Sequence, residues 1–201
     1  MVTTDFCDLE QVGGVRVLRL KSDSATNRLT RACVLALIEV FSDLAHEAKP
    51  LIVAGSKRFF SVGADLREIS ALTGPEALEF SRMGQTLMNA IERFPSPVYA
   101  AISGYCMGGG LDLALACHRR IASPNAVLAH RGAALGLITG WGGTQRLPRL
   151  VGKANVLEIF VAAEKVAAGD AMSYGLVDAV AENPVAEAVR QIQVHHIQSR
   201  H

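Results

Sequence analysis

The sequence lacks long apolar runs and any concentration of charge of one sign. No stretch approaches the roughly 18 consecutive apolar residues of a transmembrane helix, so we expect no membrane span. Its 201 residues include 20 lysine and arginine and 19 aspartate and glutamate, giving a net charge of +1 with both signs mixed along the chain. Without a basic stripe or polybasic cluster, we expect neither nucleic acid nor a membrane among its partners.

Cysteine is also sparse and follows no motif. The four cysteines show neither C-x-x-C spacing nor the framework of a small secreted protein, which indicates reduced thiols. The first residues, MVTTDFCDLEQ, contain acids and no apolar segment of a signal peptide. We therefore expect a cytoplasmic protein, and the sequence indicates no metal site.

Hydrophobic residues make up 50% of the chain and charged residues 19%, which argues against disorder. The short runs LIVA (51–54) and VYAAIS (98–103) are typical of strands buried on both faces. Helices are predicted after Thr30, a possible N-cap, and from Pro75, which suits a first helical position. Strands alternating with helices predict an α/β fold with one core.

Three glycine-rich segments stand out: SVGADL, CMGGGLD and ITGWGGTQRL. None is a P-loop, and none is the G-x-G-x-x-G of a dinucleotide fold after a first strand. The first two lie in predicted loops, 55–65 and 104–110, that follow buried strands. In open α/β sheets ligands gather beyond the carboxyl ends of such strands.

Four stretches together resemble the crotonase family, also called the enoyl-CoA hydratase/isomerase family. They are RFFSVGADLREI (58–69), SPVYAAISGYCMGGGLDLALACHRRIAS (96–123), LGLITGWGGTQRLPRLVGKANV (135–156) and AMSYGLVDAV (171–180). The resemblance implies a crotonase-like ββα spiral over residues 1–182. Residues 183–201 would then form a short C-terminal tail or helix, where the family usually has a larger helical segment. It also implies a homotrimer or a dimer of trimers.

The resemblance implies a chemistry as well. Family members bind acyl-CoA thioesters and hold the thioester oxygen with two backbone N–H groups while an enolate forms. The matching donors here are Ala64 and Gly109. Preorganised donors aimed at developing charge are usually the largest catalytic contribution. Coenzyme A is then part of the substrate, and no separate cofactor is expected.

Further substrate-binding residues follow from the same resemblance. Arg67 stands where the family often has a basic residue near the coenzyme A phosphates; the alternative is a solvated helix residue. Asp65 is expected to cap the next helix. The full expected set is Ser24, Ala25, Thr26, Asp65, Leu66, Arg67, Gly108 and Gly132.

The chain departs from the family's hydratases at both acid–base positions. Those enzymes use two glutamates, one to activate water and one to deliver a proton to carbon, whereas this chain has Asp112 and Gly132 there. Simple hydration is therefore in question. Isomerisation, decarboxylation and thioester hydrolysis remain open because the oxyanion donors are retained.

His130 is a hypothetical replacement for the missing carboxylate. If AVLAH is a strand, His130 lies two residues before Gly132 and faces the same way. Imidazole exchanges protons near neutral pH. The alternative is a structural histidine or one at a subunit contact.

The sequence thus predicts a CoA-thioester lyase or isomerase that stabilises an enolate, with Ala64, Gly109, Asp112 and His130 as catalytic candidates. The alternative is a non-catalytic acyl-CoA-binding or assembly subunit that kept the fold and lost the carboxylates.

Overall fold

A six-stranded sheet forms the framework of the computed structural model, which describes residues 4–198. Its order is β1-β2-β4-β7-β9-β12, and only β1 runs antiparallel to its neighbour. The bounds are β1 Cys7–Val12, β2 Val15–Leu20, β4 Leu51–Ala54, β7 Val98–Ile102, β9 Arg119–Ala122 and β12 Ala179–Val180. A turn at Gly13 and Gly14 joins β1 to β2, and the predicted strands 51–54 and 98–103 are confirmed as β4 and β7.

Helices α1 (Arg31–Ala45), α3 (Gly74–Glu92) and α4 (Gly109–Ala116) contribute to the main core on one side of this sheet. Thr30 caps α1 as predicted, because its hydroxyl accepts the N–H of Cys33 at 3.1 Å. Pro75 occupies the first turn of α3, also as predicted. The two long helices pack against each other and meet α4, which carries the glycine-rich segment at its start.

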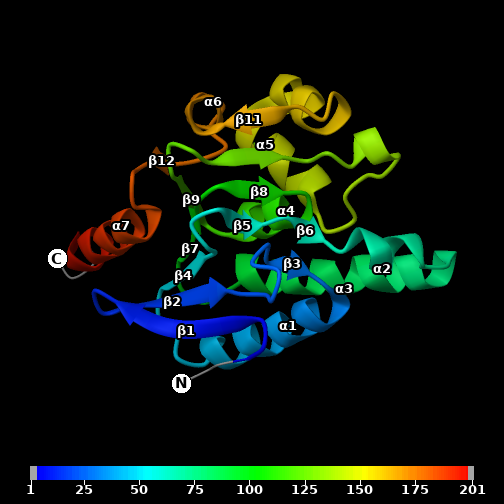
Figure 1. Ribbon diagram of the computed structural model, residues 1–201. Coiled ribbons are helices and arrows are strands. Elements are labelled where there is room, and N and C mark those ends of the chain that lie inside the picture. Colours follow the sequence, from blue (N-terminus) through cyan, green and yellow to red (C-terminus); the bar gives the residue numbers. More distant parts are fainter. Residues whose placement is uncertain (1–3, 199–201) are drawn as a thin grey trace.

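A smaller four-stranded sheet lies beside the first and has the order β11-β10-β8-β5 (Figure 1). Its strands are β5 (Phe59–Ser61), β8 (Tyr105–Met107), β10 (Val127–Ala129) and β11 (Lys165–Ala167). A third, two-stranded sheet pairs β3 (Arg28–Leu29) with β6 (Gly63–Ala64).

These strands correct the prediction that 55–65 and 104–110 are loops. β5 and β6 lie within the first segment, and β8 and the start of α4 lie within the second. The strands are too short for an alternating hydrophobic pattern to develop. Their pairing instead comes from backbone hydrogen bonds between segments far apart in sequence.

The last third of the chain returns along the small sheet. A 3-10 turn, η1 (Ala133–Leu135), precedes α5 (Gly143–Val156), which is interrupted at Gly152, where φ is +75°. A π-helical turn, η2 (Leu157–Val161), then leads to α6 (Ala168–Ser173). The backbone is non-helical at Gly152, so α5 consists of two helical pieces.

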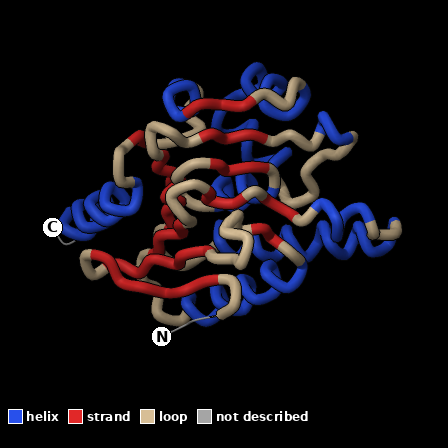
Figure 2. Tube along the Cα trace, viewed as in Figure 1, coloured by secondary structure: helices blue, strands red, loops and turns tan. Residues whose placement is uncertain are grey.

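The C-terminal helix α7 (Pro184–Gln198) covers the second face of the six-stranded sheet. Ala188, Val189 and Ile192 belong to a second apolar cluster with side chains of β2, β4, β7 and β9. Figure 2 shows the strands as a column between α7 and the helices α1 and α3. Of the two predicted states of residues 183–201, tail or helix, the described part is helical; the domain boundary at 182 stays a prediction. No helix in residues 4–198 is long and apolar enough to cross a membrane.

All four cysteines are buried and unbridged. Burial raises the pKa of each thiol, to about 12 for Cys33 and Cys117, because the thiolate loses hydration. The thiolate is the reactive form, so these thiols are poor nucleophiles in the folded chain.

We predict that the folded protein reacts very slowly with a thiol-specific chromophoric reagent at pH 8. Four equivalents should react promptly once urea unfolds it, because burial and the raised pKa values both disappear. Rapid reaction of any thiol under native conditions would contradict the described packing.

Candidate active site

An apolar cavity of about 590 Å³ opens between α2 (Leu66–Ser70), α3 and the segment that precedes α5. Its lining includes seven of the twelve residues singled out in the sequence, which are Ala64, Leu66, Gly108, Gly109, Asp112, His130 and Gly132. Most of the remaining lining is aliphatic or aromatic. Such a cavity with few polar groups is typical of a small-molecule site.

The two predicted donor loops lie against each other, backbone to backbone. A methyl group on Gly63 would come within 2.7 Å of the nitrogen of Gly109, and one on Gly109 within 3.3 Å of the nitrogen of Ala64. Gly63 also has φ at +86°, a conformation that L side chains rarely adopt. The absence of side chains at 63 and 109 therefore brings the Ala64 and Gly109 amides to one edge of the cavity.

A polar clamp fixes the strand that carries Ala64. The buried amide of Asn27 donates to the carbonyls of Phe59 and Phe60 at 3.0 and 3.1 Å. Ser61 donates to the carbonyl of Asn27 at 2.7 Å and accepts the N–H of Gly63 at 3.0 Å. Sequence reasoning missed both side chains, since their partners are mainly backbone groups distant in sequence.

Gly109 is the first residue of α4, and its amide therefore lies among those that have no partner within the helix. The positive end of the helix dipole is located here. The arrangement suits an oxygen atom that gains negative charge at this edge of the cavity.

Asp112 is 1% exposed and lies between two helix N-termini. It belongs to the first turn of α4, and its Oδ1 lies so close to Gly143, the first residue of α5, that a side chain there would overlap it. Both dipoles favour the negative carboxylate. Thr139 donates a short hydrogen bond to Oδ2, whereas Oδ1 has no hydrogen-bond partner. Asp112 thus has one buried carboxylate oxygen without a protein hydrogen-bond donor, at the edge of the cavity.

His130, 5% exposed, follows the last residue of β10 and contacts Asp112. Its Nε2 lies 3.5 Å from Oδ2 of Asp112, and its ring packs edge-on against Phe160 at 4.9 Å between centroids. Nδ1 faces Gly132, where a methyl group would be 3.7 Å away. The structure therefore brings His130 and Gly132 together at the cavity.

His130 and Gly132 lie close together for a different reason from the one predicted. β10 ends at Ala129, and Gly132 opens the η1 turn with helical angles, so strand alternation does not place the two residues on one face. The turn folds back on Gly132, whose carbonyl accepts the N–H groups of Leu135 and Leu137 at 2.8 and 2.9 Å. A methyl group at 132 would come within 2.8 Å of the carbonyl oxygen of Leu137.

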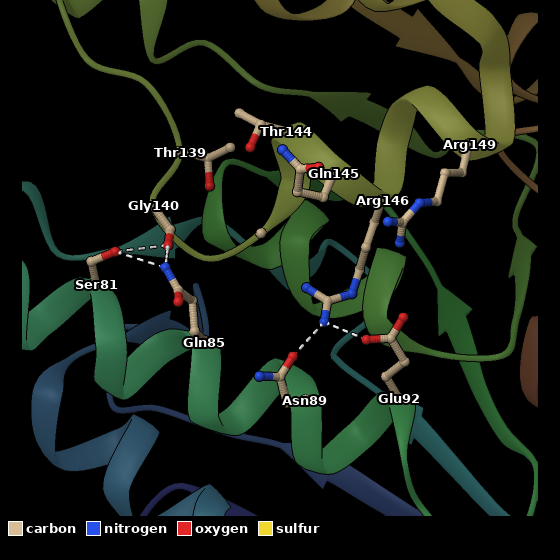
Figure 3. A pocket seen from close by; sticks show the side chains of 11 residues that line it. Ser81, Gln85, Asn89, Glu92, Thr139, Gly140, Thr144, Gln145, Arg146 and Arg149 are labelled. Carbon is tan, nitrogen blue, oxygen red and sulfur yellow. Dashed lines mark hydrogen bonds and ion pairs between the residues drawn. The ribbon is translucent and has the colours of Figure 1, made fainter.

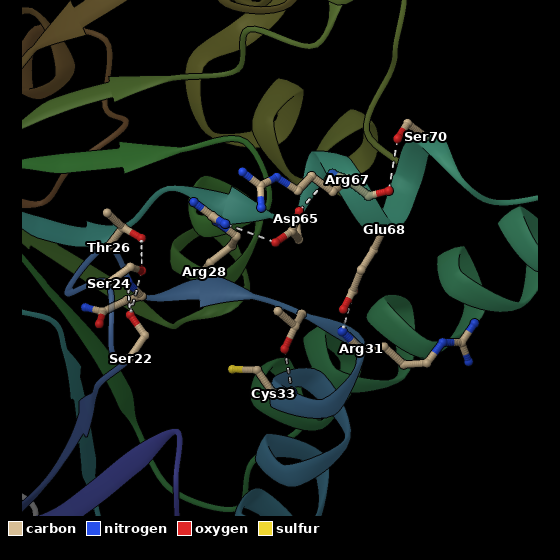
Figure 4. Close-up of polar contacts among 12 residues, drawn as sticks. Ser22, Ser24, Thr26, Arg28, Arg31, Cys33, Asp65, Arg67, Glu68 and Ser70 are labelled. Carbon is tan, nitrogen blue, oxygen red and sulfur yellow. Dashed lines mark hydrogen bonds and ion pairs between the residues drawn. The ribbon is translucent and has the colours of Figure 1, made fainter.

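Of the residues predicted to bind the substrate, Leu66, Gly108 and Gly132 line the cavity, whereas Ser24, Ala25, Thr26, Asp65 and Arg67 do not. The hydroxyls of Ser24 and Thr26 are 2.7 Å apart, beside Ala25 with φ at +55° (Figure 4). The carbonyl of Thr26 accepts the N–H of Val62, a cavity residue, at 3.1 Å.

Asp65 caps α2 by accepting the N–H of Arg67 at 2.8 Å, as predicted, and also pairs with Arg28 at 3.1 Å. The Arg67 amide bond, followed by the Arg28 pair, lowers the pKa of this carboxyl. In Figure 4 the side chains of Arg28 and Arg67 extend to the same side of α2. Asp65 therefore has a structural role, and its neighbours present positive charge beside the cavity.

A second, polar cavity of about 470 Å³ lies between α3 and α5. Buried Arg146, which lines this cavity, donates hydrogen bonds to Asn89 and Glu92 at 2.9 and 2.6 Å. Ser81 and Gln85 both donate to the carbonyl of Gly140 (Figure 3). These bonds fasten the segment before α5 to helix α3. The hydrogen bonds around the polar cavity thus hold in place one wall of the apolar cavity.

Comparison with known proteins identifies this arrangement. A family model described as enoyl-CoA hydratase/isomerase matches residues 10–199. The chain belongs to the enoyl-CoA hydratase/isomerase family. The predicted resemblance and the crotonase-like fold class are thereby confirmed.

Individual members of the family show the extent of the likeness. A probable enoyl-CoA hydratase of Bacillus subtilis is 47% identical over 64% of this chain and 50% of its own length. A crotonyl-CoA hydratase of Syntrophomonas wolfei is 37% identical over 87% of this chain and 68% of its own length. The solved enoyl-CoA hydratase of Bacillus anthracis superposes with a TM-score of 0.86 at 32% identity, covering 93% of this chain and 76% of that one. The chain thus spans only half of the Bacillus subtilis relative.

Two further site residues of this family member had no assigned role at the sequence level. Thr139 bonds to Asp112, and Trp141 closes the inner side of the cavity; both lie in the segment ITGWGG, of which the glycines drew attention. The sequence could have drawn attention to Trp141, because it is the one tryptophan of the chain.

Gly109→Ala tests the packing of the two donor loops. The new methyl group would press on the indole of Trp141 at 2.6 Å and on the Ala64 amide, so we expect a loss of stability of about 1–3 kcal/mol. Thermal unfolding measures the effect.

Gly169→Ala in α6 is the matched control. Its added methyl group meets nothing within 4 Å, so this variant should be at least as stable as the original chain. Equal behaviour of the two variants would show that the loops do not depend on Gly109.

Proposed function

We propose that this chain binds an acyl-CoA thioester and stabilises its enolate through the backbone N–H groups of Ala64 and Gly109. The observation that supports this most directly is the close approach of these two amides at the edge of an apolar cavity that also holds Asp112. The apolar lining suits a hydrocarbon acyl group. Arg67, together with Ser24, Ala25 and Thr26, suits the phosphates and polar arm of coenzyme A.

The reaction that fits best is a proton shift along the acyl chain, an isomerisation of a 3-enoyl-CoA to its 2-enoyl form. Asp112 takes a proton from the α-carbon, the C–H electron pair enters the enolate, and both amides hold its oxygen. Protonated Asp112 then returns the proton to the γ-carbon, and the double bond becomes conjugated with the carbonyl. One base with one free oxygen is sufficient, which matches a site with a single carboxylate.

Hydration of a 2-enoyl-CoA is the second candidate. It is favoured by the position of His130, whose Nδ1 faces the place of the missing carboxylate. There the imidazole would take a proton from water as the oxygen bonds to the β-carbon. Asp112, protonated for this step, would deliver a proton to the α-carbon.

The two reactions have opposite optical signatures. With 3-enoyl-CoA, isomerisation increases the absorbance of the conjugated thioester, whereas hydration of 2-enoyl-CoA removes it. Binding without any absorbance change in either assay would instead support the alternative of a non-catalytic acyl-CoA-binding or assembly subunit. Release of free coenzyme A or of carbon dioxide would identify a hydrolase or a decarboxylase.

Asp112→Asn should reduce turnover of the true substrate about 10²–10⁴-fold, because the amide cannot accept the proton. His130→Ala should leave isomerisation within a few-fold and strongly reduce hydration. Steady-state rates and pH–rate profiles of both variants measure this, with binding of a saturated acyl-CoA as the control for an intact site. Full activity of Asp112→Asn would exclude the proposed base.

Thr139→Val should reduce turnover with little change in acyl-CoA affinity. The hydroxyl accepts the N–H of Trp141 at 3.2 Å and donates to Oδ2 of Asp112, so it orients the carboxylate. We expect kcat to fall while KM is retained, and Thr139→Ser to restore the rate. An equal fall in both Thr139 variants would contradict this positioning role.

Oligomeric state and location are also proposals. We propose a cytoplasmic homotrimer or dimer of trimers, with no separate cofactor. Exposed apolar side chains such as Leu157 and Val161 on η2 are consistent with subunit contacts. Light scattering coupled to size exclusion measures the mass in solution.

A further inference from the structure

Trp141 is held firmly in the inner wall of the apolar cavity. The side chain is 3% exposed, and its Nε1 donates to the carbonyl of Phe80 at 3.2 Å. Its backbone N–H donates to Thr139, and its carbonyl accepts from Arg146 at 3.3 Å. The ring of Phe80 packs against the indole at 5.3 Å between centroids. Three hydrogen bonds and an aromatic contact thus fix the ring.

The indole fills the space between α3 and the oxyanion loop. On one side lies Gly84 of α3, where a methyl group would overlap the five-membered ring. On the other lies Gly109, where a methyl group would come within 2.6 Å of Cζ3. The ring therefore spans the gap between helix α3 and the amide proposed to hold the thioester oxygen.

An acyl group held at Gly109 starts beside this ring. Carbons directed inward, between α3 and α4, meet the indole at once. Carbons directed outward pass Leu66 and Ile138, which are 53% and 72% exposed and leave hydrocarbon in contact with water. The enclosed part of the cavity is consequently short.

We propose that Trp141 is the specificity-determining residue of the acyl pocket and restricts tight binding to short-chain acyl thioesters. The inference rests on the proposed function, since it assumes that the acyl group occupies this cavity. Removing the indole would open an inward extension bounded by Gly84 and Gly109, neither of which has a side chain to close it.

The test is calorimetric titration with butanoyl-, hexanoyl- and octanoyl-CoA, which bind without requiring turnover. The original chain should show little gain in affinity beyond butanoyl-CoA. Trp141→Ala should gain up to about fourfold for each methylene that enters the opened space. Trp141→Phe should lie between the two.

Phe94→Ala is the matched control for loss of a buried aromatic, because Phe94 packs on Phe41 and lies outside the cavity lining. It should keep the original chain-length profile. If Trp141→Ala does not fold, the variants Trp141→Phe and Gly84→Ala test the role of Trp141 instead. The added methyl group of Gly84→Ala pushes the ring into the cavity and should weaken binding of butanoyl-CoA relative to free coenzyme A.

If the original chain binds the three esters and the Trp141 variants show the same chain-length profile as the original chain, the proposed role of Trp141 is refuted. The proposed function still stands in that case. The role of Trp141 is also refuted if the affinity of the original chain rises steadily from butanoyl-CoA to octanoyl-CoA. Failure of the original chain to bind any of the three esters more tightly than coenzyme A alone would refute the proposed function itself.

Discussion

The close approach of two backbone segments, the strand around Ala64 and the start of α4, is the constraint on which the rest of the site depends. Neither segment has a side chain at the point of contact, since Gly63 and Gly109 meet there. Each is fixed from behind, one by the Asn27–Ser61 clamp and the other by the body of a buried helix. The amides are therefore positioned by the fold itself, before any ligand arrives.

The fold also positions the carboxylate of Asp112 before any ligand arrives. Asp112 gains stability from two helix ends and from Thr139, yet one of its oxygens lacks a partner in a dry environment. A buried unpaired acceptor costs stability, of the order of 1–3 kcal/mol. Such an arrangement persists when the free oxygen serves chemistry, as is common at functional sites.

Much of the fold was predictable from the sequence, because LIVA and VYAAIS are wholly apolar and because Thr30 and Pro75 mark helix starts. The short strands β5, β6 and β8 were not, because two- and three-residue strands take their identity from distant pairing partners. The family motifs gave Ala64, Gly109 and Asp112 as site residues, and the structure places them on one cavity. Thr139 and Asn27 escaped notice because their roles depend on hydrogen bonds to groups that are distant in the sequence.

The turn that begins at Gly132 limits which residues this position accepts. The Leu137 carbonyl occupies the room that a side chain at 132 would need, and the amides of Leu135 and Leu137 hold the turn closed on the Gly132 carbonyl. Any side chain at 132 would therefore have to displace the Leu137 carbonyl. The backbone from 132 to 137 would have to shift with it, so a substitution here changes the shape of the cavity wall and not only the chemistry of one residue.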